Sequence, residues 1–147
     1  MRNNAVERRL IEDVSAFGRK LKTVFEFLTR EQNITLPRMR VFASLVQKEG
    51  MNQRELAERL ELETPTVVRL LDTMEAQGFV ERRSSDTDRR AKEVHLTGLG
   101  RQTAEEVDSV AGALILRLVA GIPEEDLLTA STVIRTMQAN LQSVRTS

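Results

Sequence analysis

The fold is decided by residues 56–100, which read LAERLELETPTVVRLLDTMEAQGFVERRSSDTDRRAKEVHLTGLG. Apolar residues recur here at spacings of three and four, first at Leu56 and Leu60 and again from Val67 to Met74. Such spacing is typical of the buried face of a helix. Because only residues 61–66 separate the two patterns, the stretch predicts two short helices joined by a tight turn.

Capping signals set the limits of these two helices. Asn52 can accept a hydrogen bond at the start of the first helix, and Glu55, three residues later, can return one to the cap. For the second helix we expect Thr64 to be the cap and Pro65 to lie in the first turn, where proline loses no hydrogen bond. Gly78 favours a left-handed end to this helix.

A basic segment between two short apolar runs predicts a β-hairpin. Residues 84–88 are polar or turn-forming, and the runs 79–80 and 94–96 flank them. Residues 82–92 hold five bases and two acids, a net charge of five minus two, or +3. These are Arg82, Arg83, Arg89, Arg90 and Lys92 against Asp86 and Asp88. We expect this hairpin to be a wing with a positively charged tip.

Four further helices are expected outside this segment, at about residues 6–30, 35–50, 97–121 and 123–141. The terminal helices carry apolar stripes that one small domain cannot cover, so we expect a homodimer. The predicted fold is mainly α with a small β-hairpin wing, a winged helix-turn-helix with N- and C-terminal dimerisation helices.

The domain limits follow from this organisation. We assign residues 35–99 to the winged helix-turn-helix DNA-binding domain. Residues 1–34 and 100–147 form the predicted helical dimerisation region.

Composition excludes several classes of protein. The chain has no cysteine and one histidine, His95, which lies in an apolar-polar alternation typical of a strand, so we expect no metal and no cofactor. No Ser-His-Asp set or glycine-rich phosphate loop is present, and we expect no enzyme activity. The sequence shows neither a membrane span nor a signal peptide, and a cytoplasmic protein is expected. The net charge is zero, so any DNA-binding face must be local.

The second helix of the pair opens with side chains suited to DNA. A helix in this position enters the major groove in helix-turn-helix proteins. Thr64 and Thr66 can contact phosphate or a base edge, and Arg69 can donate a forked pair of hydrogen bonds to guanine. In the wing, Asp88 could hold one guanidinium group in place for entry into a narrow minor groove, while an ordinary mobile loop is the competing interpretation.

Residues 52–100 resemble the winged-helix domain of the multiple-antibiotic-resistance regulator (MarR) family. Asp88, Arg90, Leu96, Thr97 and Gly100 match its wing signature. The flanking segments ITLPRMRVFASL and GIPEEDLL fit as well and resemble the SlyA-like branch. The resemblance implies a dimeric transcription regulator, usually a repressor, that binds a pseudo-palindromic site on double-stranded DNA. The expected DNA-binding residues are Asn52, Gln53, Thr64, Pro65, Thr66, Arg69, Arg83, Asp88, Arg89 and Arg90.

The resemblance also implies a site for a small aromatic or anionic effector. We expect its walls between the first helix, the second helix and the start of the fifth, at Phe17, Arg19, Met39 and Phe42. Two positions depart from the family pattern. Met39 stands where tryptophan is common, and Glu61 stands where the turn often has glycine, so Glu61 is expected to be left-handed.

Two alternatives remain open. The same groove contacts would serve a ligand-independent architectural or counter-silencing DNA-binding protein. A winged helix can also bind a protein partner, although Arg69 and the segment 88–90 have no evident use there.

Overall fold

The computed structural model describes residues 4–88 and 90–146 and contains six helices and three strands in that part of the chain. The structure is mainly α with a small antiparallel sheet, as the sequence predicts. In chain order the elements are α1 (Asn4–Leu28), α2 (Leu36–Gln47), β1 (Met51–Asn52), α3 (Gln53–Leu60), α4 (Thr64–Ala76), β2 (Val80–Ser84), β3 (Lys92–Leu96), α5 (Gly98–Leu118) and α6 (Glu124–Arg145).

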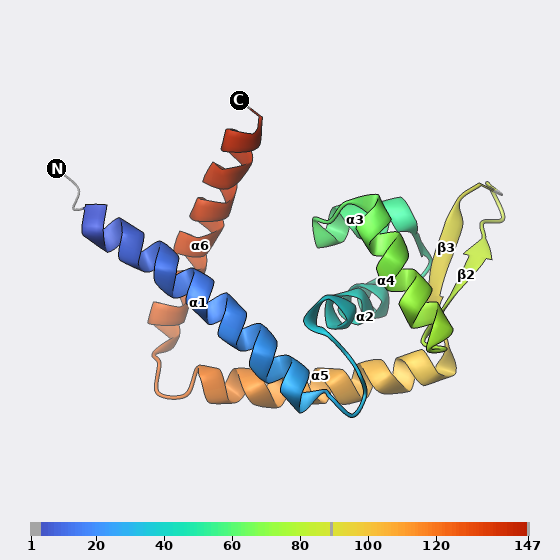
Figure 1. Cartoon of the computed structure of the whole chain (residues 1–147), viewed down its shortest axis with the longest axis horizontal. Helices are drawn as coiled ribbons and strands as arrows, with labels where there is room; N and C mark the ends of the chain where they lie inside the picture. The colour runs from blue at the N-terminus through green and yellow to red at the C-terminus, as the bar shows by residue number, and fades with distance from the viewer. Residues whose placement is uncertain (1–3, 89, 147) are drawn as a thin grey trace. The chain divides into compact units, whose positions relative to one another are not determined.

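The predicted hairpin is present as β2 and β3, with Val80 opposite Leu96 and Ser84 opposite Lys92. Sequence reasoning missed β1, which pairs antiparallel with β3 and completes a sheet of order β1-β3-β2. In Figure 1 the hairpin lies beside α4, with α2 and α3 close by. The sheet therefore joins the wing to the helix pair.

Most of the predicted helix starts are confirmed. The Thr35 side chain accepts a hydrogen bond from the Arg38 N–H at 3.4 Å, and Thr97 Oγ1 accepts one from the Gly100 N–H at 2.9 Å. Asn52 caps α3, with its Oδ1 2.8 Å from the Glu55 N. The Glu55 carboxylate accepts a hydrogen bond from the Asn52 side-chain amide at 3.0 Å, rather than from the backbone N–H.

The prediction for the start of α4 is wrong in one respect. The cap residue is Glu63, with extended backbone and no side-chain capping bond, while Thr64 is already the first helical residue. Pro65 does lie in the first turn, and Gly78 after the helix has the expected positive φ of 80°.

The core is formed by apolar side chains from α1 to the middle of α5. Phe42 and Phe79 meet edge to face with ring centroids 5.5 Å apart. The largest buried apolar side chains are Phe25, Val41, Phe42, Leu45, Leu56, Val67, Leu71, Met74, Val80, Val94 and Val107. These residues fix α4 and the hairpin on one packed body.

The contacts divide the chain into two compact units, residues 1–111 and 112–147. Within one chain, α1 thus belongs to the same unit as the winged helix. In the second unit α6 begins after Pro123, with Glu124, Glu125 and Asp126 in its first turn, and none of its described residues is buried. No helix within the described ranges is both long and apolar enough to cross a membrane.

Candidate nucleic-acid interface

The turn between α3 and α4 depends on a left-handed residue. Glu61 has φ 55° and ψ 40°, as its position in the turn predicts. Its N–H and that of Leu62 donate to the last carbonyl groups of α3, with Leu62 N 3.0 Å from Ala57 O. This backbone arrangement ends α3 and redirects the chain into α4 within residues 61–63.

Helix α4 buries one face and leaves the start of the other free. Val67, Leu71 and Met74 are buried against the core. Thr64, Pro65 and Arg69 are exposed, and Thr66 is half-buried. The Arg69 guanidinium has no ion-pair partner within the described residues. The first two turns of α4 therefore present polar side chains that can reach a DNA groove.

The wing closes at the end of its strands. Ser85 N donates to Ala91 O at 3.0 Å, one step beyond the last strand pair. Between them, Asp88 Oδ1 accepts the backbone N–H of Arg90 at 2.9 Å, and Ala91 N donates to Asp88 O at 3.1 Å. Asp88 thus binds the backbone of Arg90, and its predicted contact with a guanidinium group stays a prediction. Arg89, the other candidate, lies outside the described residues.

Two predicted DNA contacts, Asn52 and Gln53, already have partners within the protein. Both polar atoms of the Asn52 side chain are bonded to Glu55, as described for the α3 cap. Gln53 Oε1 accepts from Arg82 Nη1 at 3.2 Å. Asn52 Oδ1 and Nδ2 and Gln53 Oε1 are thus engaged within the protein.

The wing bases are not all available to DNA. Arg82 Nη2 lies 2.6 Å from Asp72 Oδ1 and 3.1 Å from Glu75 Oε1, both on α4. Hydrogen bonds from Arg82 hold the pKa of Glu75 below its ordinary value, and the same bonds raise the pKa of Arg82. Arg83 pairs with Glu81 on its own strand. The charge of +3 counted in the sequence is thus partly neutralised at the base of the wing, while Arg90 stays exposed at the tip.

Comparison with known proteins shows which family this domain resembles. Residues 34–92, which span α2 to the start of β3, match the MarR family. The chain carries a MarR-family winged-helix domain. This family consists of transcription regulators and not of enzymes, and the recognition made from the sequence is confirmed.

Solved structures share the fold over almost the whole length. The transcriptional regulator SlyA is 16% identical, with a TM-score of 0.83 over 91% of this chain and 94% of that one. FabT of Streptococcus pneumoniae, solved in complex with DNA, is 20% identical, with a TM-score of 0.79 over 94% and 99%. The transcriptional repressor CouR, bound to a 23-mer DNA duplex, is 23% identical, with a TM-score of 0.82 over 94% and 98%. At these identities the likeness shows the fold.

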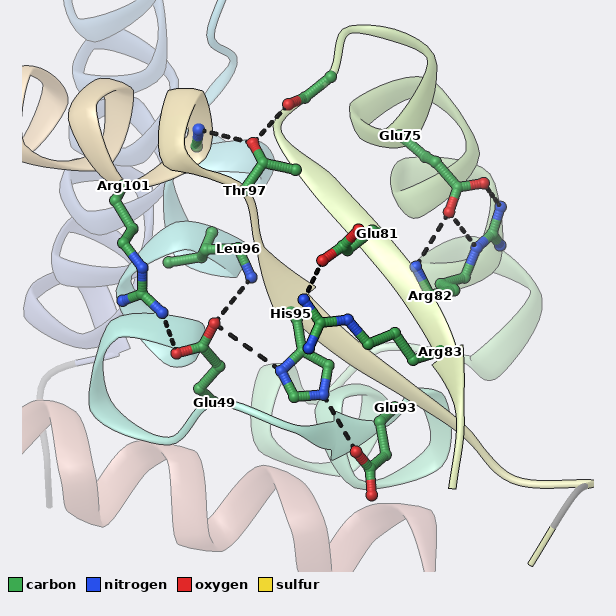
Figure 2. A network of polar contacts seen from close by, with 12 residues as sticks. Glu49, Glu75, Glu81, Arg82, Arg83, Glu93, His95, Leu96, Thr97 and Arg101 are labelled. Atoms are coloured by element: carbon green, nitrogen blue, oxygen red, sulfur yellow. Dashed lines mark hydrogen bonds and ion pairs between the residues drawn. The ribbon is translucent and has the colours of Figure 1, made fainter. Parts of the chain in front are cut away.

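A polar network on one face of the sheet connects the winged helix to α5 (Figure 2). Glu49, in the turn before β1, pairs with Arg101 of α5 and accepts the Leu96 N–H at 3.2 Å. The bond from Arg101 lowers the pKa of Glu49. His95 lies in β3, as expected, with Nε2 3.0 Å from Glu93 Oε2 and Nδ1 3.8 Å from Glu49 Oε1. Sequence reasoning missed Glu49, because its partners lie 47 and 52 residues away.

A pocket of about 220 Å³ lies between α2 and the first half of α5. Its lining residues are Met39, Phe42, Ala43, Val46, Gln47, Ala104, Glu105, Val107 and Asp108. Met39 and Phe42 are two of the four residues that the sequence analysis expects around an effector. Phe17 and Arg19, the other two, are exposed on α1 and do not line this pocket. Helical periodicity predicts which face of α1 carries Phe17 and Arg19. It does not predict which other element packs against that face.

Proposed function

We propose that the protein is a homodimeric, sequence-specific DNA-binding repressor of transcription that binds a pseudo-palindromic operator. The proposal rests on two exposed arginines, Arg69 on α4 and Arg90 at the wing tip. Neither guanidinium group has an ion-pair partner among the described residues. Arginine recognises guanine as a fork in the major groove and enters narrow minor grooves. DNA complexes of FabT and CouR, which share the fold, support the same use of this domain.

The exposed apolar surface supports the dimer. Phe27 of α1 is 61% exposed, and Leu116 and Val144 of the second unit are 72% and 73% exposed. Each of α1, α5 and α6 carries several exposed large apolar side chains, and apolar surface of this extent marks an interaction site on a soluble protein. We infer that residues 1–34 and 100–147 of two chains cover each other. Sedimentation at micromolar concentration should give about twice the chain mass of 16.6 kDa, and a folded monomer would contradict the inference.

Selection of bound sequences from a random DNA pool tests the operator proposal. Two equivalent α4 helices predict half-sites about 10 base pairs apart. Arg69→Ala should weaken binding to the selected site by about 1–3 kcal/mol and relax the preference at one base pair. An equal loss on selected and random DNA would instead identify Arg69 as a phosphate contact, and a pool without enrichment would sink sequence-specific binding.

The pocket between α2 and α5 favours a regulator released by a small molecule over a ligand-independent architectural protein. Its floor is apolar, and its lining includes the carboxylates of Glu105 and Asp108 but no base. This negative charge favours a cationic alkylamine that carries an aromatic ring, or a neutral compound, over the anionic effector expected from the sequence. Such an alkylamine should raise the melting temperature and weaken operator binding, while the matching aromatic carboxylate should do neither. The absence of any effect from both would favour the ligand-independent alternative.

A further inference from the structure

Arg82 connects the wing to both helices of the helix-turn-helix motif. Its Nη2 reaches Asp72 and Glu75 on α4, at 2.6 and 3.1 Å. Its Nη1 donates to Gln53 at the start of α3 at 3.2 Å, and its backbone N–H donates to Glu75 Oε2 at 3.1 Å. The Arg82 side chain is only 19% exposed. One strand residue therefore binds side chains from both helices.

Arginine suits this contact better than lysine does. Guanidinium presents five N–H donors in one rigid plane, whereas the ammonium group of lysine is a compact point charge. Here Nε, Nη1 and Nη2 all donate, to three different side chains. A charge held by two carboxylates is also unavailable to a DNA phosphate, because contact with DNA would first require both ion pairs to break.

We propose that Arg82 is a positioning residue, which sets the place of the wing relative to the recognition helix α4 and acts on DNA through Arg90 without touching DNA. The inference rests on the proposed DNA-binding function. From Arg82 to the hairpin closure at Ser85 the strand extends about 10 Å, at about 3.3 Å per residue. A swing of about 10° at Arg82 would therefore move the wing tip by about 2 Å, a third of the minor-groove width of about 6 Å.

A double-mutant cycle between Arg82 and Arg90 tests the proposal. On selected operator DNA, Arg82→Gln and Arg90→Ala should each weaken binding by about tenfold. The double variant should lose little more than either single one, because a misplaced tip gains nothing from Arg90. Arg82→Lys should restore part of the affinity. Losses that multiply to about a hundredfold would overturn the proposal, as would wild-type affinity in Arg82→Gln.

Arg101→Gln is the matched control. It breaks another surface ion pair, with Glu49, at the start of α5 and away from the hairpin tip. If Arg101→Gln weakens DNA binding, the fold loss of the double variant with Arg90→Ala should equal the product of the two single losses. Equal coupling of Arg90 to both variants would mean a general loss of stability and would overturn a specific role for Arg82.

Asp72→Asn tests the proposal with Arg82 left in place, because the two roles of Arg82 predict opposite changes in DNA affinity. The change removes an acid beside the DNA-facing surface, so a direct phosphate contact by Arg82 predicts tighter binding. The positioning role predicts weaker binding, because one of the two ion pairs that hold the strand is removed. Tighter binding of Asp72→Asn would overturn the proposal. Failure of the wild-type protein to enrich any DNA would instead defeat the proposed function itself.

Discussion

The close approach of α5 to the wing makes Gly100→Ala a severe change. A Cβ atom at Gly100 would lie 1.9 Å from the carbonyl oxygen of Phe79, which is backbone and cannot rotate away. The same oxygen accepts the Thr97 N–H at 3.0 Å. Ordinary contact begins at 3.4 Å, so the start of α5 would have to withdraw by about 1.5 Å. That withdrawal would break the Thr97 bond.

The expected loss of stability follows from these two effects. Overpacking costs about 1–3 kcal/mol, and breaking the backbone hydrogen bond costs about 0.5–1.5 kcal/mol. Together they predict a loss of about 1.5–4.5 kcal/mol, which corresponds to a fall in melting temperature of about 3–18 °C for a chain of this size. Thermal unfolding followed by circular dichroism, with urea titration beside it, measures both quantities.

Gly98→Ala is the matched control, two residues away on the same helix. No atom lies within 4 Å of a Cβ built at Gly98, so alanine should be neutral or stabilising by up to about 1 kcal/mol. Melting of Gly100→Ala within about 1 °C of Gly98→Ala would refute the steric argument.

Three other changes test the wing and the contact between Glu49 and α5. Asp88→Ala should weaken DNA binding, while Asp88→Asn, which keeps an acceptor for the Arg90 N–H, should not. Equal binding by the two variants in a DNA titration would contradict a role of Asp88 in holding the Arg90 backbone. Arg90→Ala should lower the slope of log affinity against log salt by about one unit for each phosphate that the arginine neutralises, without changing the melting temperature. The pKa of Glu49 is lowered in the folded state, so its bond to Arg101 stabilises the protein above pH 4.5 and is lost as pH falls below that value. Glu49→Gln should therefore reduce the acid dependence of stability, and unchanged dependence in urea titrations at pH 3–7 would count against it.

The sequence predicts the helices and the turn well because their signals are local. Leu56 and Leu60 predict where α3 ends, and the left-handed Glu61 is expected because it stands where the turn of similar proteins often has glycine. The cap of α4 lies one residue before its predicted position, since Thr64 is a common cap type but Glu63 has the extended backbone. Local sequence preferences therefore predict that a helix is present but do not fix its first residue.

Contacts between distant segments could not be predicted in the same way. Met51 and Asn52 form a strand only because β3 lies opposite, and two residues carry no periodicity. The neutralisation of Arg82 by Asp72 and Glu75 arises only after α4 and β2 pack together. A run of bases therefore gives the net charge of a segment but not which charges remain free.

The closed hairpin has a consequence for the divergence of such regulators. Because the Ser85–Ala91 bond and the Ser84–Lys92 pair fix both strands below the tip, the segment between Ser85 and Ala91 can change in length and composition without shifting their register. Under the proposed function, the preference in the minor groove could then change through this segment alone, provided that Asp72 and Glu75 of α4 still hold Arg82 at the base of the wing. The tip would be exchangeable between relatives that keep this ion-pair cluster.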